Sequence, residues 1–220
     1  MSTIAVLPMK SLDRAKSRLS GAVAHGHRRA LAEAMYSDVL VAARRTPSLK
    51  HVVVVTADHT AARIAGEHDA IVVDDTAGSH SDAAMLGIAQ ARALEATRVL
   101  LIPGDCPLLD PAEIEALLAF EVPARSALIV ADRHGTGTNA LLLTPPDALT
   151  PAFGEGSRQR HLELATAQGT AAEVVEVPTL ALDVDTPEDF QQLRVTLEAT
   201  RGRAANTRGL LLQLDRNRII

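Results

Sequence analysis

The stretch RVLLIPGDCPLLD, residues 98–110, indicates the fold of this chain most clearly. It opens with a short apolar run, which predicts a buried strand over residues 98–103. A stiff turn follows, in which Asp105 is held between a glycine and two prolines. Asp110, directly before Pro111, then predicts the N-terminal cap of a helix. A strand, a loop with a carboxylate and a helix form a βα unit, from which parallel sheets are built.

The same alternation of short apolar runs and longer Ala/Leu-rich segments continues along the chain. Central strands, buried on both faces, are predicted over residues 4–8, 51–56, 70–74, 98–103 and 127–131. The spacing of apolar residues predicts crossover helices over residues 28–44, 61–68, 82–96 and 112–120. The less regular second half is expected to form strands over residues 140–144, 172–177 and 180–184 and helices over residues 161–168 and 187–200. We therefore predict an α/β fold of three layers, with a mainly parallel sheet and an antiparallel strand.

The length and apolar content of the chain favour one core of ordinary size. With 220 residues, 47% of them apolar, the chain is expected to form a single domain over residues 1–200, with two small domains as the alternative. Residues 201–220 begin with a basic stretch and end with an apolar one. They are expected to form either a flexible tail or an arm that packs on a second subunit. In the second case the protein would be a homodimer.

The composition argues against several classes of protein. No run approaches the about 18 apolar residues of a membrane span, and residues 1–6 lack the features of a signal peptide, so we expect a cytoplasmic protein without membrane contact. The single Cys106 rules out an internal disulfide and is expected to be a small buried side chain. A net charge of −5 and an aromatic content of 2% disfavour binding to nucleic acid.

The loop expected after the first strand, residues 8–19, is rich in cations. Four fall within nine residues: Lys10, Arg14, Lys16 and Arg18. Ligands of open parallel sheets bind beyond the carboxyl ends of the strands, and cations there suit a triphosphate, whose charge must be neutralised before a nucleophile approaches. A solvated basic helix start is the alternative interpretation. The chain has neither a P-loop nor the dinucleotide motif, which disfavours a Walker ATPase and a Rossmann dehydrogenase.

Three aspartates at two expected strand ends are candidate magnesium ligands. The stiff turn around Asp105 suits Mg²⁺, which tolerates little distortion, although a turn-forming or capping role is the alternative. Alternation along the strand predicted over residues 180–184 places Asp183 and Asp185 on the same side. The three carboxylates would then hold one or two Mg²⁺ ions that bridge nucleotide phosphates.

Two glycine-containing loops carry hydroxyl side chains: DRHGTGTN over residues 132–139 and FGEGSRQRH over residues 153–161. Glycine lets backbone amides approach an anion closely, and the hydroxyls of Thr138 and Ser157 add neutral donors. Ser157, just before a helix, would also direct the N-terminus of that helix at a phosphate or carboxylate. Three basic residues that follow either assist binding or form the basic start of the helix: Arg158, Arg160 and His161.

Direct phosphoryl transfer needs little more from the protein. The attacking group is a phosphate oxygen of the substrate, already an anion at neutral pH, so no general base is required. Cations and Mg²⁺ provide charge neutralisation and alignment. The eight scattered histidines show no zinc pattern, and the chain lacks the G-x-S-x-G motif of acyl hydrolases.

Together these stretches resemble the 2-phospho-L-lactate guanylyltransferase family, a branch of the nucleotidyltransferases similar to the molybdopterin-guanine and sugar-nucleotide enzymes. The matching motifs are P-x-K with A-K-S-R-L over residues 8–19, P-G-D-x-P over 103–107, D-R with G-T-G-T-N over 132–139, F-G-x-x-S with a histidine over 153–161, and D-V-D-T-P over 183–187. The G-T-G-T-N and F-G-x-x-S pair is the specific part, whereas P-G-D and D-x-D-T-P are shared by the wider superfamily. The resemblance implies the Rossmann-like, three-layer fold of the nucleotide-diphospho-sugar transferases.

The resemblance also implies a reaction. GTP and a phosphorylated three-carbon acid would give a guanylylated acid and pyrophosphate, for assembly of the deazaflavin coenzyme F-420. The acid would be phosphoenolpyruvate, 2-phospho-L-lactate or 3-phospho-D-glycerate, and the sequence does not decide between them. The implied residue roles are Mg²⁺ binding by Asp105, Asp183 and Asp185, acid binding by Thr138, Gly154 and Ser157, and catalysis at the triphosphate by Lys10, Lys16 and Arg18 together with Asp105.

The chain departs from the family pattern at Ser81-Asp82, where relatives show a Leu-Asn pair at the start of a helix. Asp82 is therefore a candidate substrate-binding residue that influences the choice of base or acid, with a helix cap as its alternative role. Two other functions stay possible. One is a cytidylyl- or sugar-nucleotide transferase of the same fold, and the other is a non-catalytic nucleotide-binding regulator.

Overall fold

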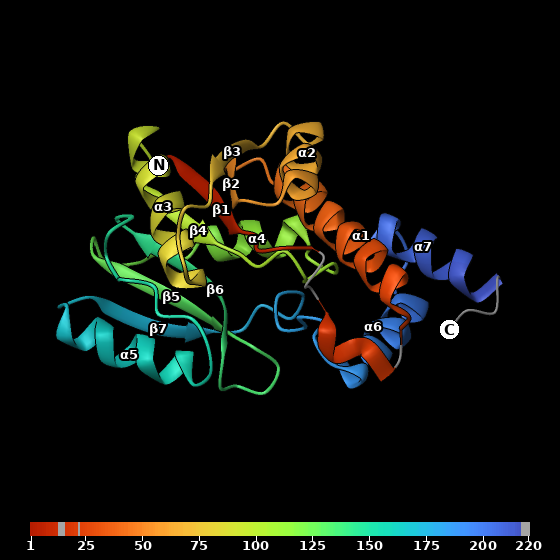
Figure 1. Ribbon diagram of the computed structural model, residues 1–220. Coiled ribbons are helices and arrows are strands. Elements are labelled where there is room, and N and C mark those ends of the chain that lie inside the picture. Colours follow the sequence, from red (N-terminus) through yellow and green to blue (C-terminus); the bar gives the residue numbers. More distant parts are fainter. Residues whose placement is uncertain (13–15, 22, 217–220) are drawn as a thin grey trace.

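A twisted sheet of seven strands runs through the centre of the molecule in the computed structural model, which describes residues 1–12, 16–21 and 23–216 (Figure 1). The strands are β1 (Thr3–Pro8), β2 (Leu49–Thr56), β3 (Ile71–Asp74), β4 (Arg98–Leu101), β5 (Ser126–Ala131), β6 (Thr138–Thr144) and β7 (Ala171–Val175). Their order in the sheet is β3-β2-β1-β4-β6-β5-β7. β6 runs antiparallel to its neighbours β4 and β5, and the other strand pairs are parallel. The predicted mainly parallel sheet with an antiparallel strand is confirmed.

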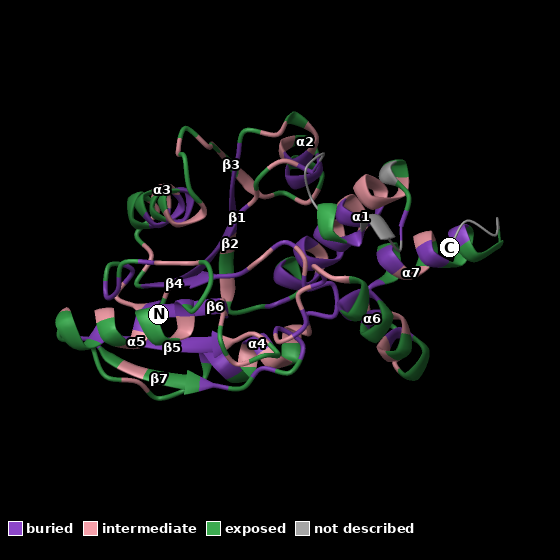
Figure 2. Cartoon of the chain, turned by 60° about the horizontal axis from the view of Figure 1, so that its bottom comes forward, coloured by how far each residue is buried: buried purple, intermediate pink, exposed green. Residues whose placement is uncertain are grey.

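Helices cover both faces of this sheet and give the predicted three layers. The helices of the described residues are η1 (Ser17–Gly21), α1 (His25–Arg44), α2 (His59–Glu67), α3 (His80–Ala93), α4 (Pro111–Leu118), α5 (Ser157–Ala167), α6 (Pro187–Ala199) and α7 (Ala205–Arg216), of which η1, α6 and α7 lie beside the sheet. The alternating side chains of each strand face different layers, because successive residues of a strand point to opposite faces. In β1, Ala5 and Leu7 pack with α1, α2 and α4, whereas Ile4 and Val6 pack with α3 and α5. The central strands are accordingly buried, while β7 at the edge is more exposed (Figure 2).

A third apolar cluster lies beside the sheet and joins the two ends of the chain. It contains Leu19 of η1, Met35 of α1, Phe190 of α6 and Leu211 of α7, all buried. Asp38 of α1 accepts hydrogen bonds from the backbone amides of residues 206 and 207 at 3.0 and 2.8 Å, which satisfies the first turn of α7. The segment expected as a tail or an arm therefore forms, over residues 205–216, a helix packed on α1 of its own chain. The homodimer and the cytoplasmic location stay predictions.

Local signals in the sequence are confirmed at several helix starts. Asp110 caps α4, with Pro111 in the first turn. Thr186 and Asp189 form a reciprocal capping box at the start of α6. Cys106 is a free, fully buried thiol, as expected. Among the described residues, none of the helices is both long and apolar enough to cross a bilayer.

Two predicted strands differ from the structure. The segment 70–74 was expected at the centre of the sheet, but β3 lies at its edge and its residues alternate between half-buried and exposed. The strand predicted over residues 180–184 is absent, because after β7 the chain leaves the sheet. Leu180 packs with the α1-side core and Val184 with the third cluster, so two different packing partners produce an alternation that resembles that of a strand.

The packing of α3 against the sheet depends on Gly87. A Cβ atom at this position would lie 2.2 Å from Cγ1 of Val6 and 3.0 Å from Cγ2 of Val55. We expect Gly87→Ala to lower the free energy of unfolding by roughly 1–3 kcal/mol, because α3 must move away from two buried strands. Thermal or urea unfolding measures this loss.

Gly66→Ala in α2 is the matched control, since nothing lies within 4 Å of a Cβ atom there. This change is expected to be neutral or to stabilise the protein by up to about 1 kcal/mol, because alanine is the better helix former. Equal effects of the two substitutions would contradict the close contact between α3 and the sheet.

Candidate active site

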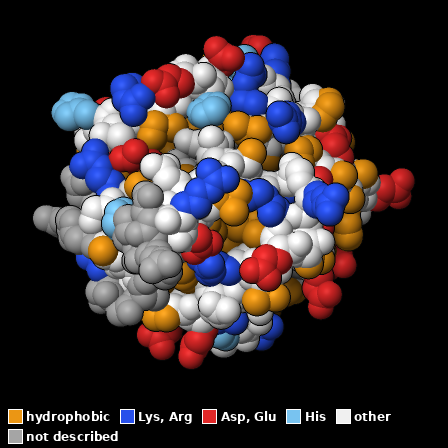
Figure 3. Space-filling model, turned by 90° about the vertical axis from the view of Figure 1, so that its right-hand side faces the viewer, with side chains coloured by type: hydrophobic (Ala, Val, Ile, Leu, Met, Phe, Trp, Pro, Cys, Tyr) orange, Lys and Arg blue, Asp and Glu red, His pale blue; other side chains and the backbone are white. Residues whose placement is uncertain are grey.

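Two adjoining pockets lie beyond the carboxyl ends of the parallel strands, where ligands of open α/β sheets bind. The first has a volume of about 450 Å³ and the second about 570 Å³. They share a wall of five residues: Pro8, His80, Pro103, Asp105 and Asp185. Figure 3 views the molecule from the side toward which the parallel strands run, and on this face Lys and Arg side chains surround a central hollow, with Asp and Glu side chains between them.

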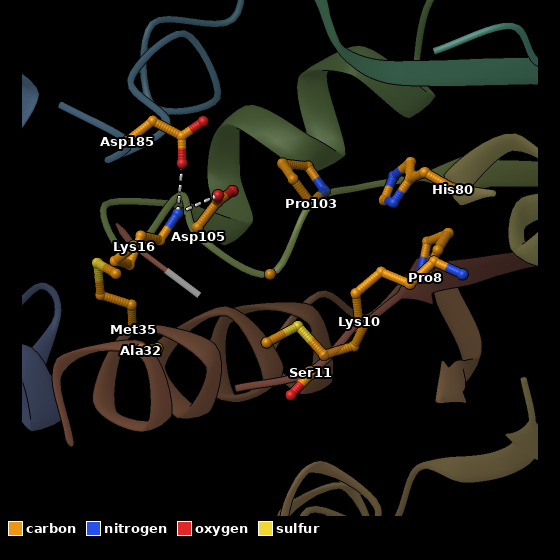
Figure 4. A pocket seen from close by; sticks show the side chains of 12 residues that line it. Pro8, Lys10, Ser11, Lys16, Ala32, Met35, His80, Pro103, Asp105 and Asp185 are labelled. Carbon is orange, nitrogen blue, oxygen red and sulfur yellow. Dashed lines mark hydrogen bonds and ion pairs between the residues drawn. The ribbon is translucent and has the colours of Figure 1, made fainter. Parts of the chain in front are cut away.

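The first pocket is largely apolar, with cationic groups at its border (Figure 4). Met9 and Met35 contribute apolar lining, and Lys10 and Lys16 also line the pocket. The Lys10 ammonium lies 2.6 Å from Oδ2 of Asp75, which follows the carboxyl end of β3. An apolar lining with a few charged groups suits a nucleoside whose phosphates extend toward the cations.

Lys16 joins the two predicted acidic loops. Its Nζ atom lies 2.5 Å from Oδ2 of Asp105 and 2.8 Å from Oδ1 of Asp185 (Figure 4). Burial by itself lowers the pKa of this ammonium, but the two carboxylates outweigh burial and leave the pKa above its ordinary value. The side chain of Lys16 is therefore charged. Its backbone has a φ of 60°, a left-handed conformation that costs a non-glycine residue about 1 kcal/mol or more.

Asp183 completes the acidic side of the second pocket. Its Oδ1 atom accepts a hydrogen bond of 3.1 Å from Nδ2 of Asn139. Burial raises the pKa of the Asp183 carboxyl, and the nearby charges of Asp105 and Asp185 raise it further. The three carboxylates of Asp105, Asp183 and Asp185 thus lie close enough to influence one another.

The predicted hydroxyl residues also gather in the second pocket. Thr138, Gly154 and Ser157 all line it, together with Arg18 and the three aspartates. Gly154 has a φ of 114°, which only glycine adopts readily, so the loop before α5 depends on this residue. Thr138 at the start of β6 and Ser157 at the start of α5 are buried, with 9% and 1% of their surfaces exposed, and both belong to the pocket wall.

Asp82 and Arg14 differ from the other predicted residues in their placement. Asp82 is exposed, accepts a hydrogen bond from the Ser79 hydroxyl at 2.7 Å, and lines neither pocket. Its neighbour Ser81 lies closer to the site, since its Oγ accepts a hydrogen bond of 2.9 Å from the Phe153 amide. Arg14 lies outside the described residues.

Two residues near the site, Asp75 and His80, were not recognised from the sequence as candidates, and Ser81 was noted only as part of the departure at Ser81-Asp82, where Asp82 was the candidate. Asp75 follows a predicted strand, and ligands of open parallel sheets bind beyond the carboxyl ends of the strands, so its position in the sequence could have identified it. His80 lines both pockets, and burial lowers the pKa of its ring. His80 and Ser81 stand at the start of α3, and a helix start by itself gave no signal for their roles.

The fold is that of the nucleotidyltransferases. The chain matches the structure of a Desulfovibrio desulfuricans G20 protein, described as a nucleotide-diphospho-sugar transferase, with a TM-score of 0.76 and 15% identity over 98% of this chain and 96% of that chain. A nucleotidyl transferase from Methanothermobacter shares this fold as well, with a TM-score of 0.63 and 18% identity over 90% of this chain and 99% of that chain. More specifically, a family model described as "Guanylyl transferase CofC like" matches residues 3–212, and the chain belongs to this family.

Two curated relatives agree with this assignment. The phosphoenolpyruvate guanylyltransferase of Conexibacter woesei is 53% identical over 218 residues, which are 98% of each chain. The 3-phospho-D-glycerate guanylyltransferase of Colwellia psychrerythraea is 34% identical over 201 residues, 88% of this chain and 91% of the relative. The predicted fold, the guanylyltransferase family and the assignment as a transferase enzyme are confirmed.

Proposed function

We propose that this enzyme transfers GMP from GTP to the phosphate of phosphoenolpyruvate and releases pyrophosphate. The proposal rests on two adjoining pockets that share Asp105 and Asp185. One pocket is largely apolar and bordered by lysines, and the other is lined by glycines and hydroxyls. Two substrates held side by side across one acidic wall is the arrangement that a direct transfer requires. The choice of phosphoenolpyruvate follows the name of the relative at 53% identity.

The proposed reaction exchanges one phosphoanhydride for another. A phosphate oxygen of the acid attacks the α-phosphorus of GTP, the bond from that phosphorus to the bridging oxygen breaks, and pyrophosphate leaves with the electron pair. Lys10, Lys16 and Arg18 neutralise the triphosphate and the leaving pyrophosphate. Thr138, Gly154 and Ser157 hold the acid. The chain therefore needs no general base, because the nucleophile is already an anion.

Magnesium fits the donor set of this site. Asp105, Asp183 and Asp185 offer the carboxylate oxygens that Mg²⁺ prefers, and all three line the second pocket. Within residues 1–12, 16–21 and 23–216, no three His, Cys, Asp or Glu side chains converge as a ready cation cage. Mg²⁺ does not require one, since it is usually held by one or two carboxylates together with substrate phosphates. When bound, it would neutralise phosphate charge during the transfer.

The purified protein with GTP, Mg²⁺ and phosphoenolpyruvate is expected to release pyrophosphate, and phosphoenolpyruvate is expected to give a higher kcat/KM than 3-phospho-D-glycerate or 2-phospho-L-lactate. ATP and CTP in place of GTP test the base, and chelation of the metal is expected to abolish turnover. A coupled pyrophosphate assay measures all of these reactions. Release of no pyrophosphate from GTP with any of the three acids would overturn the proposal.

A further inference from the structure

His161 lies behind the wall of the second pocket and connects two of its parts. Its ring is completely buried in α5. The Nε2 atom accepts a hydrogen bond of 2.8 Å from the backbone amide of Ala152, and Nδ1 lies 3.0 Å from Oγ1 of Thr138. One imidazole ring thus contacts both the strand that begins with Thr138 and the loop that leads to Gly154.

These two contacts define where the ring proton lies. A backbone amide can only donate, so Nε2 of His161 must present its lone pair to Ala152. In a neutral imidazole the proton is then on Nδ1, which donates to Oγ1 of Thr138. A neutral ring agrees with its surroundings, because burial and the nearby charge of Arg160 lower the pKa of His161 to about 4.

The direction of this bond leaves the proton of the Thr138 hydroxyl free to be donated to another group. Its oxygen accepts from His161, so its own proton must be donated elsewhere. Among the described residues, Oγ1 of Thr138 has no second hydrogen-bond partner, and the residue lines the second pocket beside Ser157. A hydroxyl held in this way presents a donor to whatever occupies that pocket.

We infer that His161 is a positioning residue for the acid substrate: its Nδ1–H group turns the Thr138 hydroxyl so that it donates to a carboxylate or phosphate oxygen of the acid. The inference rests on the proposed function and deepens it. Carboxylate and phosphate oxygens only accept hydrogen bonds, whereas a freely rotating hydroxyl could equally accept from a neutral ligand. The fixed proton therefore favours a hydrogen-bond acceptor, such as a carboxylate or phosphate oxygen, at this point of the pocket.

Neighbouring rings hold His161 in this orientation. The ring of Phe153 meets that of His161 edge to face, with centroids 5.5 Å apart, and it meets the ring of His80 in the same way at 5.1 Å. The Phe153 amide donates to Oγ of Ser81. The ring of His161 consequently cannot turn without moving the loop that carries Gly154, and the proton position is maintained by packing.

Two substitutions separate the role of Nδ1 from that of Nε2. In His161→Gln the longer amide can still accept from the Ala152 amide, but the donor to Thr138 is lost. In His161→Asn the amide nitrogen lies near the former Nδ1 and can donate to Thr138, whereas the Ala152 amide loses its acceptor. We expect His161→Gln to raise KM for phosphoenolpyruvate about tenfold and to leave KM for GTP unchanged. We expect His161→Asn to lower the thermal stability but to keep KM for phosphoenolpyruvate near that of the wild type.

A double-mutant cycle with Thr138→Val tests the connection directly. If His161 acts through the Thr138 hydroxyl, His161→Gln has no further effect on KM for the acid in the Thr138→Val background. Additive effects would show that His161 only supports the loop, and the inference would fail. A rise of KM for GTP equal to that for the acid would contradict it as well.

The position of the proton can be measured without turnover. Nitrogen-15 NMR of protein labelled at histidine is expected to show His161 neutral at pH 7, with the proton on Nδ1 and none on Nε2. Calorimetric titration with phosphoenolpyruvate alone, on wild type and His161→Gln, supplies an affinity that does not depend on guanylyl transfer. A proton on Nε2, an equal affinity of the two proteins, or no binding by the wild type would each overturn the inference. Absence of pyrophosphate release, with these results as expected, would overturn only the proposed reaction.

Discussion

Asp105→Asn is expected to lower kcat for guanylyl transfer by about a thousandfold while the protein stays folded. Asp105 belongs to the wall that both pockets share, so its carboxylate borders the proposed positions of both substrates. Asparagine has the same shape but lacks the charge that a magnesium ion and the Lys16 ammonium require. Steady-state kinetics with saturating Mg²⁺ measure the effect, and circular dichroism and thermal unfolding report the fold.

Asp110→Asn is the matched control for this substitution, since Asp110 lies five residues further along the chain and lines neither pocket. Its side chain caps α4 by accepting from the Ala112 amide at 2.9 Å and forms an ion pair with Arg203. Asparagine caps a helix about as well as aspartate, so kcat should be unchanged. Comparable losses in both variants, or a kcat of Asp105→Asn within tenfold of the wild type, would exclude the role given to Asp105.

Lys16→Met is expected to reduce both the stability of the metal-free protein and its use of GTP. Without the ammonium, Asp105 and Asp185 face each other near Asp183 with no cation between them. Removing one partner of a fully buried ion pair costs about 3–5 kcal/mol. The side chains of Asp105 and Asp185 are 27% and 44% exposed, so we expect a smaller loss of about 2 kcal/mol, together with a roughly hundredfold fall of kcat/KM for GTP.

Magnesium provides a second measurement on the same variant. In the wild type a cation must displace Lys16 from the two carboxylates, whereas in Lys16→Met they are free. Mg²⁺ is therefore expected to raise the Tm of Lys16→Met more than that of the wild type. Methionine retains the length and the β-carbon of the side chain, so the strain of the left-handed backbone is the same in both proteins.

Lys50→Met serves as its control, because Lys50 is exposed on β2. It should change the free energy of unfolding by less than about 0.5 kcal/mol and leave the response to Mg²⁺ unaltered. If Lys16→Met melts at the wild-type temperature without metal, or gains nothing from Mg²⁺, the ammonium does not compensate these carboxylates as we describe.

The fold could be predicted because the apolar runs of its central strands fit few types of secondary structure and few sheet arrangements. Continuous apolar runs such as that over residues 98–103 indicate strands buried on both faces, and the acids and glycines that follow mark the strand ends. The failure over residues 180–184 has a clear cause. Leu180, Leu182 and Val184 are buried at every second position, but they enter two different cores, and local periodicity does not distinguish this from a strand.

The sequence predicted those site residues that lie at the ends of strands. It did not predict the interactions between residues that are far apart in the chain. Lys10, Asp105 and Thr138 stand at or just beyond the ends of strands, and all three line a pocket. The bridge made by Lys16 needs partners 89 and 169 residues away and a left-handed backbone, neither of which leaves a signal in the sequence. The role inferred for His161 depends on the direction of one hydrogen bond, which only the surrounding structure defines.

The helix α7 has a consequence for synthesis of the protein on the ribosome. Its first turn is held by Asp38, 168 residues earlier in the chain, and it helps to enclose the apolar cluster that also contains Leu19 of η1, the segment that carries Arg18. A growing chain emerges from its N-terminus, so η1 leaves the ribosome long before the helices that support it have been made. The segment that carries Arg18 can therefore reach its packed form only after α7 has also left the ribosome.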